Sequence, residues 1–175
     1  MLHSRPTGNN HQCDHPLLLE VYDLAAKYGV PVVVHVEHEY AEELERALAY
    51  NRKAKIIWAH YGDALPELLR VMMARNPNLY ADLSAINPIA GFRNPEIAPA
   101  DSEGNIKADW KALFLEFPDR FVFGIDMGIT EERYQNAPEV VKYYRKVLGQ
   151  LPKSVATKVA NDNILVLLGR DVGCQ

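Results

Sequence analysis

The sequence has few of the features that mark secreted, membrane or nucleic-acid-binding proteins. Only two cysteines occur among its 175 residues, Cys13 and Cys174, and two cysteines make no disulfide framework. No apolar run reaches the roughly 18 residues that a membrane-spanning helix needs, and the first ten residues are too polar for a signal peptide. The formal net charge is -4, with Lys and Arg scattered among acids, so no basic surface for nucleic acid is expected. We therefore expect a cytoplasmic protein that binds neither nucleic acid nor a membrane.

Short apolar runs that alternate with helical patterns predict an α/β protein. Four runs have the β-branched and aromatic residues typical of strands, and segments with helical periodicity separate them. The expected strands are residues 31–36, 55–60, 78–84 and 120–126. The expected helices are residues 15–28, 40–51, 65–75, 109–117, 131–151 and 154–168, and loops are expected at residues 1–14 and 86–106.

This order of elements leaves two architectures open. Strands that alternate with helices form a parallel sheet, which is either an open doubly wound sheet or part of a (β/α)8 barrel. No Gly-x-Gly-x-x-Gly motif follows any strand, which disfavours the dinucleotide-binding version of the open sheet. Hydrophobic residues make up 48% of the chain, enough for a single domain over residues 1–175. A complete barrel needs at least roughly 200 residues, so within the second architecture the chain has room only for a partial TIM-type barrel of about four strands, covered by helices.

Three of the four expected strands end in residues that bind metals well. The runs VVVH, IIWAH and VFGID end in His35, His60 and Asp126. Ligands bind at the carboxyl ends of the strands in parallel α/β folds, so these side chains are expected to lie on one rim. Strict alternation along each strand places Val33 on the face of His35, and Trp58 on the face of His60.

Two imidazoles and a carboxylate on one rim indicate a hydrolytic metal site. Neutral imidazole and carboxylate are good ligands for zinc, and a bound metal lowers the pKa of its water. Simpler roles remain open, because His35 can end a strand with an ordinary hydrogen bond and Asp126 can cap the next helix. Thr130 is the better cap for that helix, which favours the site role for Asp126. Glu37 is a weaker candidate that shares the strand parity of His35.

Two further polar residues end the third expected strand. Asp82 and Ser84 occur in the run YADLS. Short polar side chains at such positions more often orient neighbours or cap a turn than take part in catalysis. We therefore expect a supporting role for both.

Several segments together resemble the second half of the amidohydrolase-related family of metal-dependent hydrolases. They are HPLLLEVYDLAAKYGVPVVVHVE, AKIIWAHYGD, NPNLYADLS, FPDRFVFGIDMG and VANDNILVLLG, and they span residues 15–169. The resemblance implies a (β/α)8 barrel with a divalent metal, most often zinc. His35 is similar to the family's fifth-strand histidine ligand and His60 to its sixth-strand histidine. Asp126 is similar to the eighth-strand aspartate, which usually also shuttles the proton.

One part of the family pattern is missing from this chain. The first strand of the family carries a His-x-His pair, and none of the six histidines here has that spacing. The resemblance therefore implies the C-terminal half of a barrel, with His35, His60 and Asp126 as metal ligands and with His60 and Asp126 as catalytic residues. The substrate-binding residues are not readable.

Two functions from different classes follow. The first is metal-dependent hydrolysis of a C–N or C–O bond next to a carbonyl in a small-molecule substrate, or a related decarboxylation. For this function the chain would be only part of the enzyme. The alternative is a catalytically silent fragment that acts only as a folding or association module. Exposed sheet edges would favour either a homo-oligomer or pairing with a missing N-terminal half.

Overall fold

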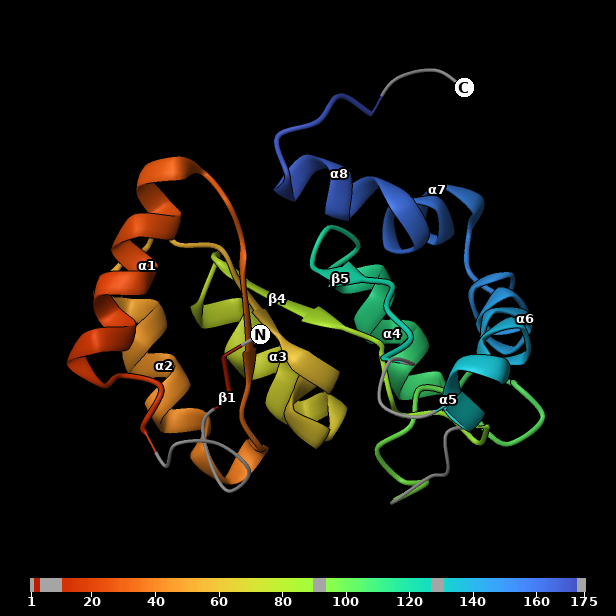
Figure 1. Cartoon of the computed structure of the whole chain (residues 1–175). Coiled ribbons are helices and arrows are strands. Elements are labelled where there is room, and N and C mark those ends of the chain that lie inside the picture. The colour runs from red at the N-terminus through yellow and green to blue at the C-terminus, as the bar shows by residue number, and fades with distance from the viewer. Residues whose placement is uncertain (1, 4–10, 90–93, 127–130, 173–175) are drawn as a thin grey trace.

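The protein is built around one parallel sheet of five strands (Figure 1). The computed structural model describes residues 2–3, 11–89, 94–126 and 131–172. The strands lie in sequence order, and each pairs in parallel with the next. They are β1 (Leu2–His3), β2 (Val32–His35), β3 (Ile56–Trp58), β4 (Leu79–Asp82) and β5 (Phe121–Val122). Among these strands β1 and β5 are edges, so the sheet is not closed, and the prediction of a partial barrel is confirmed.

The first strand contradicts the sequence-based expectation of a loop over residues 1–14. Leu2 pairs with Val34, and His3 pairs with His35, in parallel register with β2. Two residues are too few to show strand periodicity in a sequence. The strand is therefore visible only from its pairing with β2.

Four helices follow the expected pattern closely. They are α1 (Pro16–Tyr28), α2 (Ala41–Tyr50), α3 (Pro66–Arg75) and α4 (Ala108–Glu116). Gly29 ends α1 in a left-handed conformation with φ 69°, which glycine adopts without steric cost. Pro66 begins α3, where its missing N–H has no helical partner to lose. Among the described residues, no helix has the length and apolar character to cross a membrane.

The two long C-terminal helices expected from the sequence are each divided. Residues 131–151 form α5 (Glu131–Gln135) and α6 (Ala137–Leu148), because Pro138 lies in the first turn of α6 and cannot donate to the preceding turn. Residues 154–168 form α7 (Lys153–Thr157), a π-helical turn η3 (Lys158–Asp162) and α8 (Asn163–Leu167). The Val159 carbonyl in this turn accepts a hydrogen bond from Phe123 N at 2.9 Å. The turn thereby attaches the C-terminal helices to the chain that leaves β5.

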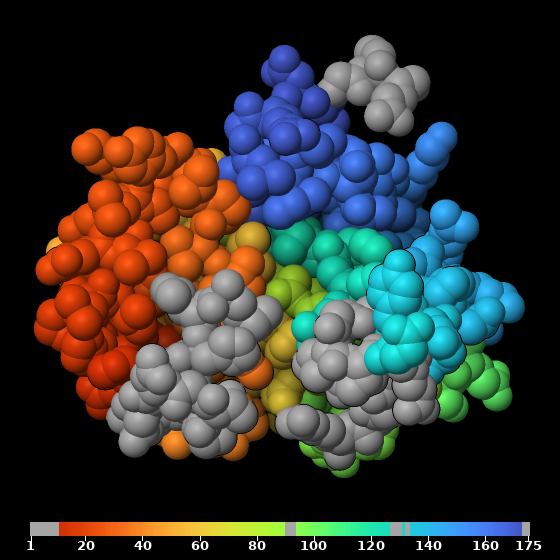
Figure 2. All heavy atoms as spheres, viewed as in Figure 1, coloured from red at the N-terminus to blue at the C-terminus, as the bar shows by residue number. Residues whose placement is uncertain are grey.

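The two faces of the sheet pack against different parts of the chain. Trp58 lies in the main core, which also contains the buried residues of α2, α3 and α4. Ile57 lies on the opposite face with Val122, where Leu167 of α8 covers both. Figure 2 shows yellow, green and teal segments from the middle of the chain between the orange N-terminal and blue C-terminal parts of the molecule. Each fully buried large apolar side chain contributes about 1.5–3 kcal/mol.

The faces of β3 are therefore opposite to those that alternation from His60 predicted. Trp58 was expected on the face of His60 but packs into the main core. The strand ends at Trp58, and His60 lies in the following turn η2 (Ala59–Asp63), whose backbone is not extended. Side chains alternate between the two faces only while the backbone is extended, so the face of His60 does not determine the face of Trp58.

Candidate metal and catalytic site at the carboxyl ends of the strands

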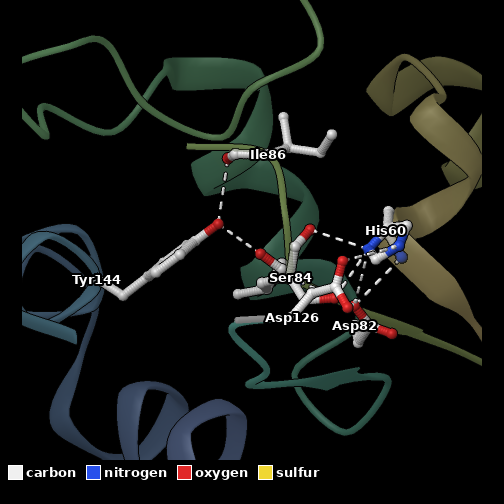
Figure 3. A network of polar contacts seen from close by, with 7 residues as sticks. His60, Asp82, Ser84, Ile86, Asp126 and Tyr144 are labelled. Carbon is white, nitrogen blue, oxygen red and sulfur yellow. Dashed lines mark hydrogen bonds and ion pairs between the residues drawn. The ribbon is translucent and has the colours of Figure 1, made fainter. Parts of the chain in front are cut away.

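His60 lies at the centre of a polar cluster beyond β3 and β4 (Figure 3). Its side chain is only 9% exposed. The ring atom Nδ1 lies 3.2 Å from the carbonyl oxygen of Ser84 and 2.8 Å from its Oγ. A carbonyl oxygen only accepts hydrogen bonds, so Nδ1 carries the proton and donates it. In the neutral imidazole the other ring atom, Nε2, is then unprotonated and can bind a metal or accept a proton.

Asp82 at the end of β4 holds this arrangement in place. Its Oδ1 accepts hydrogen bonds from the backbone N–H of His60 at 3.2 Å and from that of Ser84 at 2.9 Å. The Ser84 hydroxyl also donates to Asp82 Oδ1, which leaves Ser84 Oγ as the acceptor for His60 Nδ1. The expected supporting role of Asp82 and Ser84 agrees with these contacts.

The structure brings the three residues predicted from the sequence together. Asp126 Oδ2 lies 3.8 Å from His60 Nε2, the ring nitrogen that does not contact Ser84 (Figure 3). The rings of His35 and His60 meet edge to face, with centroids 5.0 Å apart. The side chains of His35 and Asp126 are 25% and 29% exposed, so both border solvent.

Backbone strain concentrates at the same rim. Within the described part of the chain, every non-glycine residue with a positive φ lies just past β3, β4 or β5. These residues are His60 (52°), Tyr61 (44°), Asp63 (54°), Ala85 (65°) and Asp126 (48°). Each such conformation costs on the order of 1–3 kcal/mol and persists only when its surroundings enforce it. Strain of this kind is typical of functional sites.

Two buried aromatic residues fix the loops that carry the site. Tyr144 of α6 shares its hydroxyl hydrogen bond between the carbonyl oxygens of Leu83 and Ile86, on either side of Ser84 (Figure 3). Burial raises the pKa of Tyr144 far above its ordinary value, so the hydroxyl remains a donor. Trp58 Nε1 donates to the Val36 carbonyl at 2.6 Å and so holds the end of β2 against β3.

The donor atoms suit a zinc ion in their chemistry and partly in their spacing. Two ligands of a tetrahedral zinc ion, each about 2.0–2.2 Å from it, lie about 3.3–3.6 Å apart. The 3.8 Å between His60 Nε2 and Asp126 Oδ2 slightly exceeds that range, so a small shift of either side chain would bring both into contact with one ion. No group of three His, Cys, Asp or Glu side chains in the described residues is already arranged to hold an ion. His60 and Asp126 therefore provide two donor atoms of the right type, and a complete zinc site needs at least one more ligand close to them.

The fold and the rim define a class: partial TIM-type barrels with histidine and aspartate at the carboxyl ends of the strands. The chain belongs to the amidohydrolase family, whose pattern it matches over residues 2–170. A comparison with curated proteins finds no match.

Solved structures share this fold at low sequence identity. An uncharacterised TIM-barrel protein from Bordetella bronchiseptica superposes with a TM-score of 0.63 at 17% identity, over 91% of this chain and 54% of that one. An amidohydrolase from Burkholderia multivorans, solved with bound zinc, gives 0.57 at 10% identity, over 94% of this chain and 62% of that one. The same protein with bound HEPES gives 0.55. This chain therefore spans between 54% and 62% of the length of these proteins.

The structure adds detail to two residues that the sequence had already marked. Ser84 was expected to orient its neighbours, and its hydroxyl and carbonyl oxygens lie next to His60 Nδ1. The Asp82-x-Ser84 spacing at a strand end is the signal that pointed toward it. Glu37 was the weaker candidate, and its Oε1 lies 4.0 Å from His35 Nε2.

Replacing Ser84 by alanine is expected to loosen His60 without unfolding the protein. The variant removes the hydroxyl between Asp82 and His60 Nδ1 but keeps the backbone carbonyl. Loss of such an outer contact typically lowers metal affinity by about 10- to 100-fold. Zinc titration calorimetry measures the change, and circular dichroism checks the fold. Ser102→Ala, at an exposed position, is the matched control. Equal affinities for both variants would contradict the positioning role of Ser84.

Proposed function

We propose that this chain supplies the C-terminal half of the active site of a metal-dependent hydrolase, with His35, His60 and Asp126 as ligands of a zinc ion. The observation that carries the proposal is the pairing of His60 Nε2 with Asp126 Oδ2 at 3.8 Å. Because Nδ1 donates its hydrogen bond to Ser84, Nε2 of the neutral ring presents its lone pair toward the Asp126 carboxylate. Family membership supports a hydrolytic reaction.

The reaction is the hydrolysis of a C–N or C–O bond next to a carbonyl. When bound, zinc lowers the pKa of its water and polarises the substrate carbonyl. Asp126 is partly exposed and lies beside His60, so its carboxylate can accept a proton from the attacking water and pass it to the leaving group. His60 keeps one orientation throughout, because Asp82 and Ser84 bind its backbone and its ring.

The remaining part of the active site comes from outside this sequence. The chain spans 54% and 62% of the two barrels to which it is similar, and its sheet is open. In this proposal a segment with the first strands of a barrel adds the His-x-His ligands and closes the sheet, either in the same polypeptide or as a second one. The isolated chain then binds zinc more weakly than a complete barrel and turns over little substrate.

Zinc binding by the chain and its variants tests the metal site. Titration calorimetry of the wild type is expected to show one zinc per chain, and His60→Ala and Asp126→Asn should each weaken binding by about 10-fold or more. His38→Ala is the matched control, because its ring is 45% exposed and belongs to the turn after β2. If the wild type binds no zinc, or if all three variants bind as it does, the chain is the silent fragment instead.

A further inference from the structure

A groove with a volume of about 440 Å³ lies where α6 meets α7 and η3, among the C-terminal helices of Figure 1. Sites for small molecules commonly have volumes of about 300–1,000 Å³ and mostly apolar walls. Most of the lining here is apolar, and its side chains come from the segment after β5, from α6, and from α7 with η3: Phe123, Val141, Tyr144, Leu148, Ala156 and Ala160. All of these residues belong to this chain, so the groove forms without a second polypeptide.

Arg145 brings a positive charge into this apolar groove. Its side chain is exposed, and in the described part of the chain no hydrogen bond or ion pair occupies its guanidinium group. The residues three and four positions away on either side are Lys142, Val141, Leu148 and Gly149, so no acid lies within reach along the helix. The guanidinium group is therefore available to an anion from solution.

The helices around the groove are positively charged in a protein that is negatively charged as a whole. Residues 137–162 contain five Lys or Arg and two Asp or Glu, whereas the chain has a formal net charge of -4. Two of these cations are already paired, Lys142 with Glu139 at 3.6 Å and Lys158 with Asp119 at 2.6 Å. The surplus of positive charge attracts anions to this side of the molecule.

The apolar walls restrict which anion fits. A small inorganic anion would have to give up its water against hydrocarbon, which is unfavourable. A molecule with an apolar body and one carboxylate matches both features, because arginine binds a carboxylate through two parallel hydrogen bonds while the body covers the walls. Thr157, also in the lining, adds a hydroxyl donor.

Two aromatic residues join this groove to the loops at the rim. The Tyr144 ring lines the groove, and its hydroxyl donates to carbonyl oxygens on either side of Ser84. Phe123 meets the Tyr144 ring edge to face, with centroids 5.6 Å apart, and lies three residues before Asp126. A molecule in the groove would thus pack against the side chains that support both loops.

We infer that the groove between α6 and α7 is a binding site for a small apolar carboxylate, of the class of medium-chain fatty acids. The carboxylate lies on Arg145, and the hydrocarbon lies against Val141, Leu148 and Ala156. This site is separate from the metal site proposed above and uses none of its residues. Because the groove exists only in the folded chain, its ligand also stabilises the fold.

Calorimetric titration of the 175-residue chain with octanoate tests this inference, and thermal unfolding follows the same binding. One octanoate per chain is expected, with a Tm that rises with octanoate concentration. Octylammonium and octan-1-ol share the hydrocarbon but lack the negative charge, so they should bind at least about 10-fold more weakly. Neither measurement involves a metal, so failure of the zinc site and failure of this site are distinguishable.

Three variants locate the bound octanoate. Arg145→Gln should weaken binding by about 10-fold or more, through loss of a charged hydrogen-bond donor. Lys142→Gln makes a similar change on the same helix, at a side chain that is 79% exposed and outside the groove, and should bind as the wild type does. Ala156→Leu extends a side chain into the groove and should abolish binding, with circular dichroism as the check on folding.

Several results would overturn the inference. They are no octanoate binding by the wild type, equal affinities for the three eight-carbon ligands, and equal affinities for Arg145→Gln and Lys142→Gln. The form extended by an N-terminal half should bind octanoate as the short chain does. Loss of binding in that form would show that another protein segment covers the groove, which would also overturn it.

Discussion

An Asp126→Asn variant of the completed barrel is expected to lose about 10²- to 10⁴-fold in turnover while remaining folded. Asparagine keeps the size of the side chain and can still contact His60, but it cannot accept the proton of the attacking water. In the complete site the other ligands still hold the ion, so loss of the proton acceptor is the dominant effect. Because Asp126 borders solvent, with 29% of its side chain exposed, the substitution leaves no buried charge unpaired.

The measurement compares the short chain with an extended form that carries an N-terminal half, in one polypeptide or as two. Hydrolysis of a panel of esters, lactones and amides is followed for both forms, together with their metal content. The extended wild type should gain both metal and turnover, and Asp126→Asn should remove the turnover. Asp171→Asn, at an exposed position near the C-terminus, is the matched control. Full turnover by a chain that lacks His35, His60 and Asp126 together would falsify the assignment.

Among the Gly→Ala substitutions at the described glycines, Gly62→Ala is expected to destabilise the fold most. A Cβ at Gly62 would lie 2.1 Å from two ring carbons of Trp58, whose side chain is fully buried. The indole would have to move, and its hydrogen bond to the Val36 carbonyl would break. Overpacking of this kind costs about 1–3 kcal/mol, and the positive φ of 67° adds about 1–2 kcal/mol for alanine.

Thermal unfolding measures this effect, with an expected fall in Tm of roughly 5–15 °C for a chain of this size. Gly29→Ala is a matched control, because Gly29 has nearly the same φ, 69°, and no atom within 4 Å of the added methyl group. The control isolates the cost of the backbone conformation, and the difference between the variants is the cost of crowding Trp58. Equal losses in the two variants would show that contact with Trp58 is not decisive. Zinc affinity should also fall in Gly62→Ala, since His60 lies in the same turn.

The sequence by itself determined the fold class and the residue types at the rim. Alternating strand and helix patterns allowed only a parallel α/β fold, and the apolar runs before His35, His60 and Asp126 marked where strands approach a common edge. These signals are local, because strand propensity and helical periodicity act over about 5 to 15 residues. The clustering of the three residues at one rim followed from the rule that parallel strands end at the same side of a sheet.

The tertiary structure alone decided the details on which the proposed chemistry depends. β1 exists because β2 offers it a partner, and no pattern in two residues can show that. The orientation of His60 comes from a turn with positive φ and from contacts with residues more than twenty positions away, so strand alternation gave the wrong face for Trp58. Which nitrogen of His60 is free, and how Glu37 comes to have a buried oxygen near His35, depend on packing between segments distant in sequence. Contacts of that kind form only when the chain has folded, and the sequence carries no local record of them.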